Sequence, residues 1–97
     1  MDKQSYVYML ASRRYGTLYV GVTSDLVRRA RQHREKLADG FTKRYSVKIL
    51  VWYEIHFDIL EAIKREKQIK QWNRVWKIEL IQKENPMWRD LFDEIST

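Results

Sequence analysis

Two short runs of aromatic and β-branched residues near the N-terminus constrain the fold of this chain most strongly. The runs YVYMLA (6–11) and TLYVGVT (17–23) are separated by SRRYG, whose glycine can adopt a positive φ. A pair of such runs joined by a short turn is typical of a β-hairpin. We therefore predict two adjacent antiparallel strands at the start of the fold.

The rest of the chain alternates between helical and extended patterns. Segment 25–39 predicts an amphipathic helix, capped by Ser24 or Asp25 and ended by Asp39-Gly40. The inward stripe of this helix consists of Leu26, Ala30, His33 and Leu37. We expect a loop at 41–48, a buried strand at 49–55, and helices at 58–71, at 74–84 with Asn73 as cap, and at 87–95.

The predicted order is ββαβααα, an α+β fold in which a three-stranded antiparallel-type sheet is flanked by helices. A length of 97 residues favours one small domain, spanning 1–97, with one site at most. The chain has no cysteine, which excludes a disulfide framework and a thiolate zinc site. Apolar runs such as 49–53 are far shorter than the ~20 residues of a membrane helix. We expect a soluble, cytoplasmic protein without membrane contact.

Positive charge is concentrated in the middle of the chain. The net charge is +6; segment 25–48 has eight basic and three acidic residues, and segment 61–77 has six and two. Such a concentration attracts polyanions, and a phosphate backbone is the commonest biological partner. Lys43 and Arg44 are candidates for this contact, although solubility alone can also explain a basic surface.

Tyrosines stand at matching places in the two hairpin strands. Because side chains alternate along a strand, Tyr6 and Tyr8 share one face of the first strand, and Tyr19 and Gly21 share one face of the second. The glycine removes a side chain and leaves a hollow that a ligand or another backbone can approach. Tyrosines are also common strand formers, so two of them do not yet define a site.

The helix that follows adds an arginine and a histidine on one face. Arg29 and His33 are four residues apart; His33 lies on the inward stripe and Arg29 at its border. A histidine in this position is often a hydrogen-bonded core residue, and a functional role is the competing hypothesis. Three further arginines point elsewhere and are candidates for a solvated face or for phosphate contacts: Arg28, Arg31 and Arg34.

A carboxylate interrupts the inward face of the next predicted helix. Glu66 falls in the stripe formed by Ile59, Ala62, Ile63 and Ile69. A carboxylate there is costly unless it is paired, protonated or bound to a metal. A salt bridge to an arginine such as Arg29 and the binding of Mg²⁺, which accepts one carboxylate and several waters, are both open.

Together these residues resemble the GIY-YIG nuclease superfamily, in particular its small, single-domain bacterial members. YVY at 6–8 stands where the family has GIY, and YVG at 19–21 stands where it has YIG. Arg29 and His33 match the helix signature, and Glu66 in REKQIK matches the metal-binding glutamate.

Some positions depart from the family pattern. Tyr6 and Val7 replace the glycine and isoleucine of the first motif, and Thr23 follows the second motif where a lysine is often found. The family's late asparagine corresponds to Asn85 or, less closely, to Asn73.

The resemblance implies an endonuclease that hydrolyses phosphodiester bonds of nucleic acid with Mg²⁺ or Mn²⁺ held by Glu66; DNA is favoured over RNA as the substrate, and both remain open. Arg29 would bind the scissile phosphate. Tyr8 would orient and deprotonate the attacking water with help from Tyr19, and His33 would accept or relay the proton. Gly21 would leave room for the sugar-phosphate backbone.

Two other functional classes are compatible with the residues. A nucleic-acid-binding module without turnover would use the same basic helix and aromatic strands. A protein-interaction domain would need neither metal nor nucleic acid. In every case we expect a monomer or a weak dimer.

Overall fold

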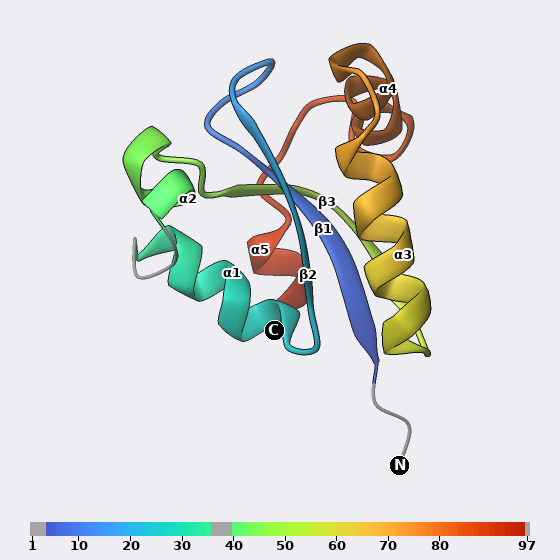
Figure 1. The fold of residues 1–97 in the computed structure, drawn as a ribbon. Coiled ribbons are helices and arrows are strands. Elements are labelled where there is room, and N and C mark those ends of the chain that lie inside the picture. The colour runs from blue at the N-terminus through green and yellow to red at the C-terminus, as the bar shows by residue number, and fades with distance from the viewer. Residues whose placement is uncertain (1–3, 36–39, 97) are drawn as a thin grey trace.

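Three antiparallel strands form the centre of the protein, in a computed structural model that describes residues 4–35 and 40–96. The strands are β1 (Ser5–Ala11), β2 (Leu18–Thr23) and β3 (Ile49–His56). They lie in the order β2-β1-β3, and both pairs are antiparallel (Figure 1). The predicted hairpin and the predicted three-stranded α+β architecture are confirmed.

Helices occupy the remaining positions of the predicted order ββαβααα. They are α1 (Leu26–Arg34), α2 (Gly40–Tyr45), α3 (Ile59–Lys70), α4 (Arg74–Glu84) and α5 (Phe92–Ile95). The short helix α2 is an addition, because segment 41–48 was expected to be a loop. Among the residues that the structure describes, none of these helices is long and apolar enough to span a membrane.

Side-chain caps define the starts of the three longest helices, and those at Asp25 and Asn73 were expected. The carboxylate of Asp25 accepts from the Arg28 amide, and Asp58 and Asn73 cap α3 and α4 in the same way. The predicted end of α1 at Asp39-Gly40 is wrong: α1 ends at Arg34, and Gly40 opens α2 without the positive φ of a C-terminal cap. Leu37 and Asp39 lie outside the described residues.

The hairpin turn uses a different residue from the one expected. Tyr15, and not Gly16, has the positive φ, at 60°. A tyrosine can hold this conformation only if its surroundings stabilise it. The guanidinium of Arg74 donates to the carbonyls of Tyr15 and Gly16 at 2.6 and 2.8 Å, and the Tyr15 ring packs 5.1 Å from the ring of Trp88.

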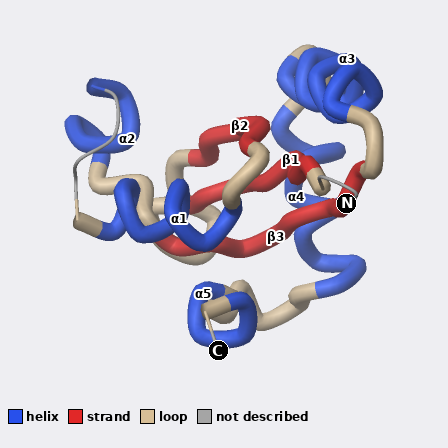
Figure 2. The backbone as a smooth tube through the Cα atoms, turned by 90° about the horizontal axis from the view of Figure 1, so that it is seen from below, coloured by secondary structure: helices blue, strands red, loops and turns tan. Residues whose placement is uncertain are grey.

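The sheet separates two apolar layers. Figures 1 and 2 show α1 and α2 on one side of it and α3 and α4 on the other. The layer under α3 and α4 includes Val7, Met9, Val20, Trp52, Ala62, Ile69 and Ile81. The opposite layer, under α1 and α5, includes Tyr8, Leu10, Leu26, Leu50 and Leu91. Because successive side chains of β1 face opposite sides of the sheet, Tyr8 lies on the α1 side and its neighbours Val7 and Met9 lie on the α3 side.

The predicted helix at 87–95 is helical only from Phe92, because a loop built on Asn85 precedes it. The Asn85 side chain donates to the carbonyls of Val51 and Arg89 at 3.0 and 2.9 Å, and it accepts from the Arg89 amide at 3.0 Å. Trp88 within the loop has a φ of 56°, which a right-handed helix does not allow. Asn85 is 3% exposed and holds this loop against β3.

Candidate active site

A buried chain of hydrogen bonds joins β1, α1 and α2. The Tyr8 hydroxyl lies 3.1 Å from His33 Nε2, and His33 Nδ1 lies 3.0 Å from Thr42 Oγ1. All three residues are at most 3% exposed. A neutral imidazole donates from one ring nitrogen and accepts at the other, so these two bonds can be made together. The chain can therefore hold a proton between a phenol and an imidazole.

Local sequence explains two of the three members of this chain. α1 starts directly after β2, so its inward stripe, with Leu26, Ala30 and His33, faces the same side of the sheet as Tyr8. No comparable signal in the sequence points to Thr42. It is nine residues after His33, in a segment without clear periodicity, and only the fold of α2 brings its hydroxyl to the imidazole.

Gly21 makes room for the Tyr8 ring. Gly21 stands directly opposite Tyr8 in the β1-β2 ladder. A Cβ atom at Gly21 would lie 2.5 Å from both Cζ and Oη of Tyr8. The hollow that we expected to admit a sugar-phosphate backbone is thus filled by the phenol itself, and the glycine sets the position of Tyr8.

We expect Gly21→Ala to destabilise the protein by about 1–3 kcal/mol, the usual cost of overpacking a core. The new methyl group would overlap a phenol that is 1% exposed and hydrogen-bonded to His33. Gly40→Ala is the matched control, since a Cβ atom there meets nothing within 4 Å. Urea unfolding of both variants measures the difference. A Gly21→Ala protein as stable as Gly40→Ala would contradict this packing.

Tyr19 lies beside the buried pair but closer to the surface. Its ring centroid is 6.2 Å from that of Tyr8, 5.4 Å from the imidazole of His33 and 6.1 Å from the ring of Phe41. Tyr19 is half-buried, whereas Tyr8 is buried. The structure thus brings the two predicted tyrosines and the predicted histidine together, and α2 adds a third aromatic residue to this group.

Arg29 borders a polar pocket next to the edge strand β2. The pocket has a volume of about 300 Å³, and Val22, Thr23, Ser24, Asp25, Arg28 and Gln32 also line it. The Arg29 guanidinium is partly buried and donates to Gln32 Oε1 at 3.2 Å. Two guanidinium groups outnumber the one carboxylate at this pocket, which leaves a net positive charge suited to an anion such as phosphate.

The other predicted cations differ in their surroundings. Arg28, Arg31, Lys43 and Arg44 are exposed on α1 and α2. Arg34 instead forms an ion pair with Asp90, and its guanidinium lies 4.7 Å from the ring of Phe92. These contacts fasten the C-terminal segment to α1.

Glu66 lies on the other side of the sheet from Tyr8. It is 9% exposed and lies on α3 between Ala62 and Ile69, which both pack in the α3 layer. Lys70 Nζ is 2.7 Å from Glu66 Oε2, so the described ion partner is this lysine and not Arg29. α3 packs against β1, β2 and β3, and β2 is one of the two edge strands of the sheet.

The described residues contain no group of three or more His, Asp or Glu side chains that could hold a metal ion. A metal ion at Glu66 would therefore have fewer than three such protein ligands among the described residues, with water and substrate oxygens completing its shell. Mg²⁺ tolerates such a shell, because it keeps several waters and needs few protein ligands. The donor set fits a hard divalent cation.

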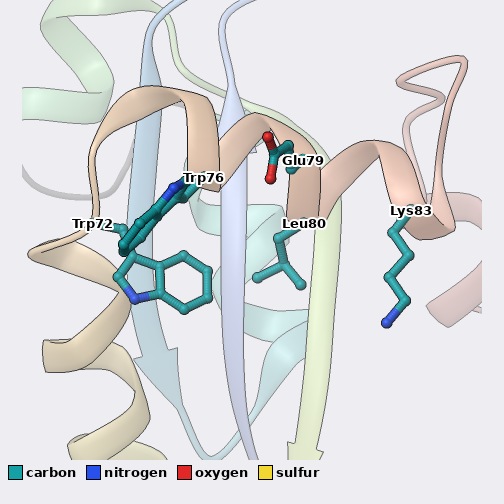
Figure 3. Close-up of a pocket in the computed structure, with 5 residues that line it drawn as sticks. All are labelled: Trp72, Trp76, Glu79, Leu80 and Lys83. Carbon is teal, nitrogen blue, oxygen red and sulfur yellow. The ribbon is translucent and has the colours of Figure 1, made fainter.

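A second surface pocket, of about 350 Å³, lies at the junction of α3 and α4 (Figure 3). Trp72, Trp76, Glu79, Leu80 and Lys83 line it. The two indoles meet edge to face, with centroids 6.0 Å apart. None of the predicted site residues lines this pocket.

Comparisons with known proteins place these motifs in a family. Residues 4–79 match the family model described as GIY-YIG catalytic domain. The chain is 36% identical over 84 residues to a UPF0213 protein of Syntrophus aciditrophicus, covering 86% of this chain and 94% of the relative. It is 35% identical over 81 residues to a UPF0213 protein of Staphylococcus saprophyticus, covering 84% and 96%.

A solved structure agrees with this relationship. The solution NMR structure of a UPF0213 protein from Bacillus halodurans has a TM-score of 0.56 and 26% identity, covering 97% of this chain and 98% of that one. The family match and the structural likeness both include the strands and helices that carry the tyrosines, His33 and Glu66. The chain therefore belongs to the GIY-YIG family, a nuclease superfamily, and within it to the UPF0213 proteins.

Proposed function

We propose that this protein is a single-domain, metal-dependent endonuclease that hydrolyses phosphodiester bonds of nucleic acid, with DNA as substrate. The observation that carries the proposal is the buried hydrogen bond between Tyr8 and His33 in a chain of the GIY-YIG family. Hydrolysis needs a group that takes a proton from water and a group that binds the phosphate. Residues of both kinds lie near β2.

The phenols and the imidazole form the base side of the proposed site. A phenol has an ordinary pKa near 10 and is a poor base at neutral pH unless its own proton can move. His33 Nε2 is within hydrogen-bonding distance of the Tyr8 hydroxyl and can accept that proton. Nδ1–H would then donate to Thr42 Oγ1, which keeps Nε2 as the acceptor. Because Tyr8 is 1% exposed, the attacking water would approach it past Tyr19.

The arginines of α1 form the phosphate side. Arg29 can present two parallel N–H groups to the scissile phosphate from the pocket beside β2. Arg28, Arg31, Lys43 and Arg44 are exposed and can contact flanking phosphates. We assign Arg34 and Asn85 to the scaffold, because both are held by contacts within the protein.

Glu66 would hold the divalent ion, Mg²⁺ or Mn²⁺. The bound ion would neutralise charge that develops on the phosphate oxygens. Glu66 and the tyrosines belong to opposite sides of the sheet, so in this proposal they meet the substrate around the β2 edge. A monomer or a weak dimer with one such site per chain would nick one strand at a time.

Nicking of supercoiled plasmid DNA tests the proposed function. The purified protein is expected to nick plasmid with Mg²⁺ or Mn²⁺, to lose all activity in excess EDTA, and to regain it when the metal is restored. A labelled RNA of matched length is assayed in parallel. Salt-sensitive binding of DNA without cleavage in either metal would contradict the enzyme and identify a binding module.

A further inference from the structure

The short helix α2 places two aromatic rings at the surface beside the candidate active site. Phe41 is 44% exposed and Tyr45 is 47% exposed, and their ring centroids are 5.0 Å apart. The Phe41 centroid is also 6.1 Å from the Tyr19 ring. A continuous row of rings thus leads from the tyrosine of β2 to the protein surface.

Positive charge accompanies this row. The sequence of α2, GFTKRY, has two basic residues and no acidic one, and both Lys43 and Arg44 are exposed. The Arg44 guanidinium carbon lies 5.6 Å from the centroid of the Tyr45 ring. Proteins bind unpaired nucleic-acid strands with this combination, because bases stack on the rings while cations meet the phosphates.

Other occupants fit this surface less well. An apolar peptide would cover the two rings but give Lys43 and Arg44 no anionic partner. A stable protein interface buries roughly 800 Å² on each partner, and two half-exposed rings on a helix of 6 residues supply only a small part of that. In contrast, α2 lies beside α1 and is joined to it through the His33–Thr42 hydrogen bond, so a strand held at the α1 arginines can reach the rings of α2 (Figure 1).

We propose that Phe41 and Tyr45 form a stacking platform for one unpaired base next to the phosphate that the enzyme cuts. This proposal rests on the proposed function, because that function supplies nucleic acid as the partner of the platform. The platform restricts which nucleic acid the protein prefers as its substrate. It selects nucleic acid with an unpaired base, as in a bulge, a gap or a frayed end, over a fully paired duplex.

Binding to three labelled DNA duplexes tests the platform in EDTA, where cleavage does not occur. One duplex is fully paired, one has a single bulged adenine, and one has an abasic residue in the bulge. The wild-type protein is expected to bind the adenine bulge about 5 to 150 times more tightly than the other two, the contribution of one stacked base. Fluorescence anisotropy at fixed salt gives the dissociation constants.

Variants connect this preference to α2. Tyr45→Ala is expected to bind all three duplexes equally, and Tyr45→Trp to keep the preference for the adenine bulge. Trp76→Ala is the matched control, because Trp76 is 54% exposed but lies on α4, on the other side of the sheet (Figure 1). It should behave as the wild type. Thermal melting verifies that each variant is folded.

Three results would overturn the platform. The first two are wild-type binding that does not distinguish adenine from an abasic bulge, and a preference that survives Tyr45→Ala. Absence of any DNA binding would overturn it as well. These outcomes are separate from failure of the proposed function. That failure is the absence of cleavage with Mg²⁺ and Mn²⁺, whichever duplex is bound.

Discussion

Glu66→Gln is expected to lower the rate of Mg²⁺-dependent DNA cleavage by about 10³-fold or more. Glutamine keeps the size of the side chain but removes the negative charge that would hold the ion. A bound metal supplies several kcal/mol of transition-state stabilisation, and each ~1.4 kcal/mol is a factor of ten in rate. Plasmid nicking over a range of Mg²⁺ concentrations measures the loss.

A purely structural role of Glu66 predicts a different outcome. Its described ion pair is with Lys70, four residues along α3 and half-exposed. Exposed pairs of this kind contribute only about 0.3–0.5 kcal/mol. Because Glu66 is 9% exposed, this pair is worth more, and a structural role predicts that removing either partner lowers the melting temperature. Lys70→Met removes the same pair and should keep cleavage. Glu61→Gln, an exposed change on the same helix, is the second control.

Two outcomes would refute the assignment of Glu66 as a metal ligand. If Glu66→Gln and Lys70→Met cleave DNA equally well, the carboxylate serves only the ion pair. If both lose activity and both melt at lower temperature, the pair supports the fold of α3. A metal ligand predicts that Glu66→Gln loses cleavage at an unchanged melting temperature, whereas Lys70→Met keeps cleavage.

The parts of the fold that depend on local pattern were predictable from the sequence. Alternation in β1 and β2 places Tyr8 and Tyr19 on one face, and the stripe of α1 buries His33 next to them. Both patterns are set by neighbouring residues and by the period of each element. The cap of α4 by Asn73 also depends only on residues close to it in the chain.

Features that depend on distant contacts were not predictable. Thr42 reaches His33 only because α2 folds back onto α1, and the positive φ of Tyr15 depends on Arg74 from α4. The loop on Asn85 replaces helix through contacts with β3, more than 30 residues away in the chain. Gly21 was expected to leave room for a sugar-phosphate backbone, whereas the strand register places the Tyr8 ring against it.

Tyr8→Phe is expected to lower cleavage by about 10²–10⁴-fold, the usual contribution of a general base. The change removes one hydroxyl and keeps the ring that packs against Gly21. Without the hydroxyl, no proton can pass from this position to His33. Single-turnover cleavage at saturating protein isolates the effect from substrate binding. Tyr19→Phe in the same assay shows how far the second phenol shares the role.

Tyr53→Phe is the matched control for Tyr8→Phe. Tyr53 is paired with Tyr8 across the β1-β3 ladder on the same face, but its hydroxyl donates to Glu94 at 3.3 Å. Burial and then the charge of Glu94 raise the pKa of Tyr53 above its usual 10.0, so it stays protonated near neutral pH. The neutral form of Tyr53, which stabilises the folded protein, is fully populated below the usual pKa of the phenol. Assays near pH 7 therefore leave Tyr53 uncharged. Cleavage should be unchanged.

The stability of Tyr8→Phe shows whether a loss of cleavage comes from lost catalysis or from unfolding. Loss of the buried bond to His33 should destabilise Tyr8→Phe by about 1–3 kcal/mol, which lowers the melting temperature but leaves the protein folded at 25 °C. Gly21→Ala supplies the complementary case, because it displaces the phenol without removing its hydroxyl. If Tyr8→Phe cuts DNA at the wild-type rate, the hydrogen bond to His33 belongs to the core alone, and the proposed base must be sought at Tyr19.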